Sequence, residues 1–213
     1  MRVLVIGAGG HAKVCIEALT DAPDCVVVGC VSKNGEAIQD PFAGVAVVGA
    51  DENLADLIID HAVTHAFIAV TNNRVRAAML RRCAHLGVPV ASAVSRGAFV
   101  SQSATVDVGA LLAAGSVVNT CARLGAGVIV NTNASVGHDC IIGEATHIAP
   151  AVGMGGNVMI GQQVLVGIGA RIVPSISIGD GAIIGAGSVV LRDVPPGAVM
   201  MGNPARRVQR RRP

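Results

Sequence analysis

The histidine at position 138 is followed directly by an aspartate, Asp139. An unperturbed imidazole is neutral near pH 7 and can accept a proton from an attacking amine or hydroxyl. A neighbouring carboxylate can hold the N–H on the other side of the ring, which orients the ring and stabilises its charged form. The pair therefore predicts a general base with an orienting carboxylate. A solvated histidine on a surface corner is the alternative.

A strict repeat places this pair. From Val94 onward an aliphatic residue recurs at every sixth position, and a small or β-branched residue follows four positions later. A period of six fits short strands joined by regular corners, in a chain that coils so that like positions stack. We expect both residue types to face inward. A Val/Gly-rich sandwich is the alternative. The aliphatic residues are Val94, Val100, Val106, Leu112, Val118, Leu124, Val130, Val136, Ile142, Ile148, Met154, Ile160, Val166, Ile172, Ile178, Ile184 and Val190.

The repeat also separates the roles of three consecutive residues. His138 and Asp139 are the third and fourth residues of their hexad, which places them at or beside a corner and facing outward. Cys140 occupies the inward small-residue position. A buried thiol is a poor nucleophile, so we expect Cys140 to be structural despite its closeness to a base.

A glycine turn near the start of the chain is the second motif. Gly7-Ala8-Gly9-Gly10-His11-Ala12 follows the apolar run Met1 to Ile6 and precedes a helical pattern through Leu19. This matches G-x-G-x-x-G/A, in which a helix N-terminus receives a phosphate. A dinucleotide site also needs an acid about 20 residues later, where the chain has Ser32-Lys33. We expect a phosphate or sugar-nucleotide site, with a merely structural turn as the alternative.

Strands and helices alternate through the first ninety residues, which predicts a small parallel α/β sheet. Later apolar runs, expected as strands, are Cys25 to Val31, Val45 to Val48, Ala66 to Val70 and Val88 to Ala91, and helical patterns cover Asp51 to Ile59 and Arg74 to Leu86. The predicted division is an α/β domain at 1–93, a solenoid at 94–195 and a basic tail at 196–213.

Composition excludes several classes of protein. The chain of 213 residues is 52% hydrophobic, which excludes disorder, and its net charge of +2 with no Trp or Tyr argues against nucleic-acid binding. The six cysteines contain no C-x-x-C pair, so zinc-finger and disulfide frameworks are not expected. Glycine and polar residues interrupt the apolar stretches, and no signal peptide is evident. We expect a cytoplasmic protein without membrane insertion.

With both halves in view, the chain resembles the NeuD/PglD-like sugar acetyltransferases of the hexapeptide-repeat class. The motifs that carry the resemblance are Gly7-Ala8-Gly9-Gly10-His11, Thr71-Asn72-Asn73, Asn131-Thr132-x-x-Ser135-Val136-Gly137-His138-Asp139-Cys140, Gly143-Glu144-x-x-His147 and Gly202-Asn203-Pro204-Ala205-Arg206. The resemblance implies a Rossmann-like domain, then a left-handed parallel β-helix with three hexads to a coil. It also implies a homotrimer with acetyl-CoA between neighbouring subunits.

The resemblance assigns roles to individual residues. His138 is implied as the general base, with Asp139 as its partner, for transfer from acetyl-CoA to the amino group of a nucleotide-linked amino sugar. Gly156 lies one coil after His138, so its N–H is expected to face the oxyanion. Further contacts are implied to acetyl-CoA at His147, Ile168 and Ala186, and to the sugar nucleotide at Gly9, Gly10, His11, Ser32, Lys33, Thr71, Asn72, Asn73 and Asn131. The Arg-rich tail is expected either to meet CoA phosphates or to be solvated.

Two departures from the family pattern leave the acceptor open. Ser32-Lys33 stands where such relatives carry an acidic pair, and Thr71 replaces a glycine. A hydroxyl acceptor, as in sialic acid O-acetylation, therefore stays as an alternative, and so does a non-catalytic trimeric scaffold that binds sugar nucleotides. A metal enzyme of the carbonic anhydrase kind needs three histidine ligands, whereas the repeat contains only His138 and His147. We therefore expect no metal.

Overall fold

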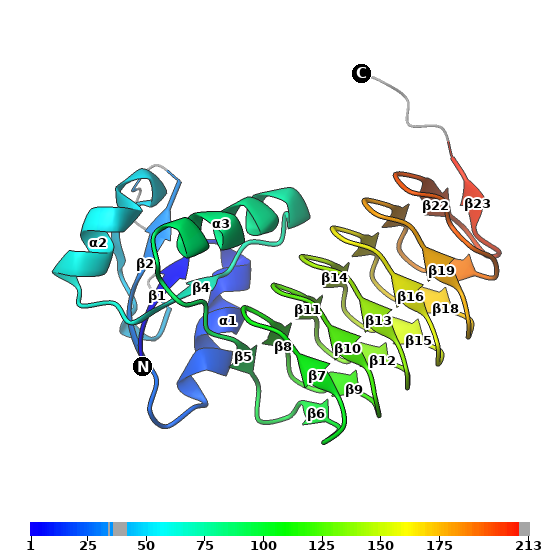
Figure 1. Cartoon of the computed structure of the whole chain (residues 1–213), viewed down its shortest axis with the longest axis horizontal. Helices are drawn as coiled ribbons and strands as arrows, with labels where there is room; N and C mark the ends of the chain where they lie inside the picture. The colour runs from blue at the N-terminus through cyan, green and yellow to red at the C-terminus, as the bar shows by residue number, and fades with distance from the viewer. Residues whose placement is uncertain (34, 36–41, 209–213) are drawn as a thin grey trace.

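The computed structural model describes residues 1–33, 35 and 42–208. A small α/β domain is followed by a prism of short strands that coils away from it (Figure 1). The α/β strands are β1 (Arg2–Ile6), β2 (Val26–Ser32), β3 (Val47–Ala50) and β4 (His65–Ile68). The helices are α1 (Gly10–Thr20), α2 (Leu54–Asp60) and α3 (Asn73–His85), with single 3-10 turns at Phe42–Gly44 and Asp51–Asn53.

The four strands are all parallel and lie in the order β3-β2-β1-β4, which confirms the predicted sheet. Four of the five residues of β1 are buried, as expected for a central parallel strand covered on both faces. The chain passes from β1 to β2 on one side, whereas β4 lies on the other side of β1. The strand order therefore reverses at the carboxyl end of β1. Open α/β sheets bind ligands at such a point. The glycine turn is located there.

The run Val88 to Ala91, which we expected as a strand, forms only one bridge, between Val90 and Ala66. Gly87, with φ of +68°, follows the end of α3, and the run then bonds to β4 at Ala66 alone, through the carbonyl of Pro89 and the N–H of Ala91. The prism begins at Ala93, where the first of its strands pairs with the next coil.

The prism has three faces. Face 1 comprises β5 (Ala93–Val94), β8 (Leu111–Leu112), β11 (Ile129–Val130), β14 (His147–Ile148), β17 (Leu165–Val166), β20 (Ile183–Ile184), β22 (Val199–Met201) and β23 (Arg206–Arg207). Face 2 comprises β6 (Phe99–Val100), β9 (Val117–Val118), β12 (Ser135–Val136), β15 (Gly153–Met154), β18 (Arg171–Ile172) and β21 (Val189–Val190). Face 3 comprises β7 (Thr105–Val106), β10 (Arg123–Leu124), β13 (Ile141–Ile142), β16 (Met159–Ile160) and β19 (Ser177–Ile178).

Strands stack with a register of one coil. Leu124 pairs with Ile142 and Ile142 with Ile160, each 18 residues further along, so three hexads make a coil as the resemblance implied. Both inward positions of the hexad form the core. In the central coils the aliphatic residues are at most 6% exposed, and Cys140 is fully buried. The hexad frame and the parallel β-helix are therefore confirmed.

The final coil is shorter than the others. Val199 pairs with Ile183 across 16 residues instead of 18, and Val194 bridges Ile178 at the same spacing. β23 then folds back antiparallel on β22. Part of the segment expected as a basic tail therefore belongs to face 1. Arg210, Arg211 and Arg212 lie outside the described residues.

Neighbouring residues of β16 provide a test of the inward positions. Ile160 is 3% exposed and Met159 is 54% exposed. Ile160→Ala should lower the free energy of unfolding by about 2–5 kcal/mol, because it leaves a cavity in the core. Met159→Ala should cost less than about 1 kcal/mol. Equilibrium denaturation in urea measures both, and equal losses would contradict the assigned frame.

Candidate active site

His138 and Asp139 lie at the corner between faces 2 and 3, after β12 and before β13. Nδ1 of His138 is 2.7 Å from a carboxylate oxygen of Asp139, and the two side chains are 61% and 52% exposed. Because an ionised carboxylate only accepts, Nδ1 carries the proton and Nε2 is left as the acceptor. Asp139 has a φ of +58°, a conformation that asparagine and aspartate tolerate better than most residues. The predicted base and partner thus face outward and are paired.

Gly156 lies directly against the ring of His138. Asn157 N–H donates to the carbonyl of His138 at 2.9 Å, which stacks the two corners. A Cβ on Gly156 would be 2.3 Å from Nε2 of His138, so any side chain here would displace the imidazole. Within the described residues the Gly156 N–H has no hydrogen-bond acceptor. Gly156 therefore makes room for the ring and presents a free donor beside it.

Cys140 is not available for chemistry. Its side chain is fully buried in the prism, and its thiol donates to the carbonyl of Gly155 at 3.2 Å. Burial raises the pKa of this thiol, which keeps it protonated. This agrees with the structural role expected for it.

A second group of imidazoles lies on face 1, where the α/β domain meets the prism. The rings of His11 and His147 have centroids 6.4 Å apart. The side-chain amide nitrogen of Asn131 is 3.1 Å from Nε2 of His147. An amide N–H donates here, so His147 accepts at Nε2 and carries its proton at Nδ1. The structure therefore brings together three residues that the sequence predicted separately.

Both imidazoles in this group are held neutral. Burial lowers the pKa of His147 to about 3, with further contributions from the positive charge of Arg76 and from His11. Burial and then Arg76 lower the pKa of His11 as well. Nε2 of His11 is buried and has no hydrogen-bond partner among the described residues. A ligand that donates to this nitrogen, or that accepts from it, would satisfy it.

Other residues expected to bind the sugar nucleotide border the carboxyl edge of the sheet. Gly9 and Gly10 begin α1, and no atom lies within 4 Å of where their Cβ atoms would be. Ser32 ends β2, Lys33 follows it on the surface, and Thr71 follows β4. The open turn and the free helix N-terminus suit a phosphate group.

Asn72 and Asn73, also expected as substrate contacts, have structural partners. The side-chain oxygen of Asn72 accepts from the backbone N–H groups of Arg74 and Val75, both at 3.1 Å, and so caps α3. The amide nitrogen of Asn73 donates to the carbonyls of Gln163 and Val164 on the prism. An Asn pair before a helix suits either a structural role or ligand binding, so the sequence alone does not distinguish the two.

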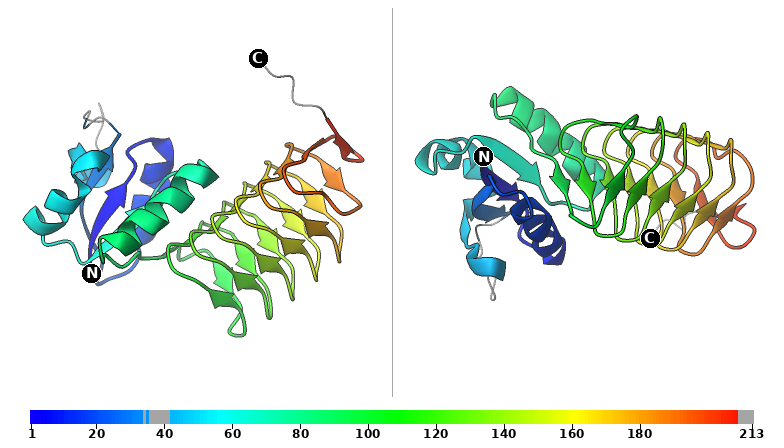
Figure 2. Two further views of the ribbon diagram at one scale, coloured as in Figure 1. Left: turned by 45° about the horizontal axis from the view of Figure 1, so that its top comes forward. Right: turned by 90° about the horizontal axis from the view of Figure 1, so that it is seen from below.

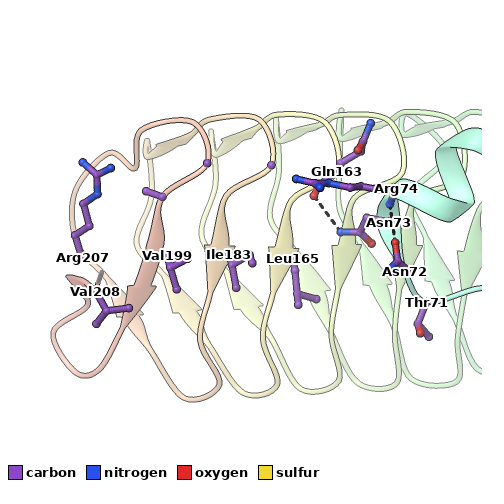
Figure 3. Close-up of a pocket in the computed structure, with 13 residues that line it drawn as sticks. Thr71, Asn72, Asn73, Arg74, Gln163, Leu165, Ile183, Val199, Arg207 and Val208 are labelled. Carbon is purple, nitrogen blue, oxygen red and sulfur yellow. Dashed lines mark hydrogen bonds between the residues drawn. The ribbon is translucent and has the colours of Figure 1, made fainter. Parts of the chain in front are cut away.

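A groove of about 1100 Å³ extends from the start of α3 along face 1. Leu165, Ile183 and Val199 follow one another across successive strands, with Arg74 toward one end and Arg207 toward the other (Figure 3). None of these three floor residues was expected from the sequence to bind a ligand. The signal that would have found it is an apolar residue in the outward strand position of consecutive coils.

Ile168 and Ala186, expected as acetyl-CoA contacts, are exposed at the corner between faces 1 and 2. Gly187 N–H donates to the carbonyl of Ile168 at 2.8 Å, so the two corners are stacked. Both residues therefore lie at one corner, which borders face 1.

The two histidine groups lie apart within one chain. His138 is at the corner between faces 2 and 3, which is opposite face 1, where His147 lies. A single chain therefore does not bring the base to the His11–His147 cluster.

Across the described residues, no three His, Cys, Asp or Glu side chains are grouped to hold a metal ion. None of the described helices has the length and hydropathy needed to cross a membrane.

Comparisons with known families match both halves of the chain. Residues 2–83 match the PglD N-terminal domain, and residues 157–192 match the bacterial transferase hexapeptide model of six repeats. No curated protein sequence matches.

Solved structures resemble the whole chain. A histidine-to-asparagine variant of perosamine N-acetyltransferase from Caulobacter crescentus, in complex with CoA and GDP-perosamine, is 35% identical with a TM-score of 0.93, and the match covers 99% of this chain and 98% of that one. The acetyltransferase domain of PglB from Neisseria gonorrhoeae, in complex with acetyl coenzyme A, is 34% identical with a TM-score of 0.89, covering 97% and 98%. WeeI from Acinetobacter baumannii is 26% identical with a TM-score of 0.86, covering 98% and 100%.

The close contact at Gly156 predicts a specific defect. Gly156→Ala should push the His138 ring away from Asp139 and break the 2.7 Å hydrogen bond, because the new methyl group would overlap Nε2. Nitrogen NMR of the imidazole should then show loss of the single Nδ1–H tautomer.

Gly97→Ala is the matched control. Gly97 also lies at a corner of the prism, but a Cβ there would be 3.6 Å or more from its neighbours. The control should leave the tautomer unchanged. An unchanged tautomer in Gly156→Ala would show that the ring does not depend on this glycine.

Proposed function

Because this chain belongs to the NeuD/PglD-like sugar acetyltransferases, we propose that it transfers the acetyl group of acetyl-CoA to the amino group of a nucleotide-linked amino-deoxy sugar, for the synthesis of a surface glycan. The observation that carries this proposal is the exposed His138–Asp139 pair, with Gly156 against the ring and its N–H without an acceptor among the described residues. A non-catalytic scaffold would have no use for this arrangement.

The chemistry follows from the protonation of this pair. Nε2 of His138 accepts a proton from the sugar amine as its nitrogen attacks the thioester carbonyl. Asp139 stabilises the imidazolium through Nδ1–H. The Gly156 N–H donates to the negative oxygen of the tetrahedral intermediate. As this collapses, the C–S bond breaks, the amide forms and the proton on His138 passes to the departing thiolate of CoA.

Binding of the two substrates divides between the halves of the chain. The open turn at Gly9 and Gly10 would receive the phosphates of the nucleotide sugar. The groove on face 1 has an apolar floor flanked by Arg74 and Arg207, which suits a pantetheine arm and its charged nucleotide. Neutral His147 pairs with Leu165 of the groove floor and would donate through Nδ1 to the acetyl carbonyl.

The separation of the histidines supports assembly of the site from two copies. His138 and the His11–His147 cluster lie on opposite sides of one prism. In a homotrimer, the corner of one subunit can face the first face of its neighbour. Large apolar side chains on the outer faces, including Phe99 at 58% exposure and Ile141 at 44%, favour such packing. We propose three equivalent sites, each shared by two subunits.

The base is tested by substitution. His138→Ala should lower kcat by about 10²- to 10⁴-fold, the usual contribution of a general base. Folding should be intact, because the side chain is exposed. Asp139→Asn should keep the backbone conformation and cost about ten- to a hundredfold, because only the charge that stabilises the imidazolium is lost.

Thiol release from acetyl-CoA is the measurement, with UDP-, GDP- and dTDP-amino sugars and free sialic acid as acceptors. Turnover of an amino sugar supports the proposal. Turnover of the hydroxyl acceptor alone would replace it with O-acetylation. Unchanged kcat in His138→Ala would show that another group removes the proton.

Shared sites predict rescue between inactive subunits. His138→Ala lacks the base, and Gly10→Trp should block the sugar-nucleotide turn without disturbing the fold, because the position is open. When the two variants are mixed as subunits at equal amounts, about a quarter of the sites should combine an intact base with an intact turn. Activity should therefore return after co-expression. Persistent inactivity of verified mixed trimers would place the whole site within one chain.

A further inference from the structure

Arg76 is the one Lys, Arg, Asp or Glu that is buried in the described part of the chain, with 1% of its surface exposed. It lies on α3 at the junction between the two domains, and no carboxylate pairs with it among the described residues. Burial lowers the pKa of its guanidinium to about 10, so it stays charged at neutral pH. An unpaired buried cation is costly, which calls for a specific reason.

All five N–H groups of Arg76 have neutral oxygen acceptors. Three of the bonds stay within the α/β domain: Nη1 donates to the carbonyls of Val70 and Thr71, and Nη2 donates to the side chain of Asn73. The other two cross to the prism. Nε donates to the carbonyl of Gly127 and Nη2 to that of Ala145, both at 2.7 Å.

These prism carbonyls form a ladder. Gly127, Ala145 and Gln163 are the fourth residues of hexads at the corner between faces 3 and 1, each 18 residues after the last. At this corner, the fourth residue donates to the carbonyl of the third residue one coil earlier, as Ala145 does to Ala126. Its own carbonyl is left over. Arg76 occupies the first two rungs, and Asn73 occupies the third through the carbonyl of Gln163.

α3 lies beside the first coils of the prism (Figure 2). Its hydrogen bonds to the ladder set its position along the prism axis. Ala145, the middle rung, precedes His147 by two residues. Docking at this rung therefore places the glycine turn with His11 opposite His147, where the rings approach to 6.4 Å. A shift by one rung, about 4.8 Å, would bring His11 to a different coil.

We infer that Arg76 is a positioning residue of the proposed acetyl transfer, which aligns the sugar-nucleotide turn with the coil that carries His147 by binding the leftover carbonyls of Gly127 and Ala145. This inference rests on the proposed function for its catalytic consequence. The docking itself stands on hydrogen bonds alone. Misplacement of about 1 Å between reacting groups can cost a hundredfold in rate.

Arg76→Met keeps the apolar stem and removes the donors. Nucleotide contacts within the α/β domain should survive, so KM for the nucleotide sugar should change less than about threefold while kcat falls about ten- to a hundredfold. Arg76→Lys restores the charge but not the forked donors, and it should recover only part of kcat. Full recovery by lysine, or unchanged kcat in Arg76→Met, would overturn the inference.

Arg81→Met is the matched control on the same helix. Arg81 also reaches the prism, through Glu144 at 3.9 Å, but its side chain is 68% exposed. This variant should keep kcat within about twofold. If Arg76 were only stabilising, Arg76→Met would lower the urea midpoint with kcat per folded subunit unchanged.

A readout without catalysis separates failure of the inference from failure of the proposed function. The positive charge of Arg76 acts on both rings, and Asn131 donates to Nε2 of His147. Cys15 interacts with Arg76, and the exposed Arg81–Glu144 pair lies at the corner. Removing the positive charge and loosening the junction should raise the pKa of His147 in an NMR titration of full-length Arg76→Met. Asn73→Ala, a milder change at the third rung, should weaken the proton contacts between His11 and His147. Unaltered titration and contacts would refute the docking role, even if wild-type protein acetylated no sugar.

Discussion

A guanidinium withdrawn from water without a carboxylate is tolerated only where every N–H has an acceptor in good geometry. In this chain three of the acceptors lie in the α/β domain, and the other two are carbonyls of the prism, at Gly127 and Ala145, that pairing between coils leaves unused. Because these carbonyls repeat once per coil, Arg76 can bind the prism only at discrete positions along its axis. In the proposed docking, the position of the glycine turn relative to His147 depends on this contact. Neutral His11 and His147 follow from the same burial and the same positive charge.

The repeat made the prism predictable to single residues. Ile142 and Cys140 occupy inward positions because period six leaves them no other side of the strand. The last coil departed from the pattern, since pairing of Val199 with Ile183 skips two positions that no periodicity marks. The expected strand at Val88 to Ala91 forms only one bridge, for a different reason. Its hydrophobicity serves packing under α3 rather than sheet extension.

The docking contact was harder to foresee. Arg76 lies among charged residues on α3, which suggests a solvated helix. Its spacing carries the opposite signal, since Arg76, Ala77 and Cys83 share one buried face at helical intervals. Asn72 and Asn73 were expected to contact substrate, and the structure gives them a cap and a rung. An amide side chain is suited to specific hydrogen bonds with either a ligand or the protein. The placement of the two domains decides which partner it has.

An exposed base poses a physical problem that assembly would solve. In the isolated chain, His138 and Asp139 are open to water, where a hydrogen bond or a charge contributes little. His138 and Asp139 cannot be buried in the core, because these corner side chains face outward from the prism. A neighbouring subunit can exclude water from the corner without altering the coil that holds the pair. In the proposed trimer, the regular prism therefore provides rigidity within each chain, and the contact between chains provides the low-dielectric surroundings that acetyl transfer requires.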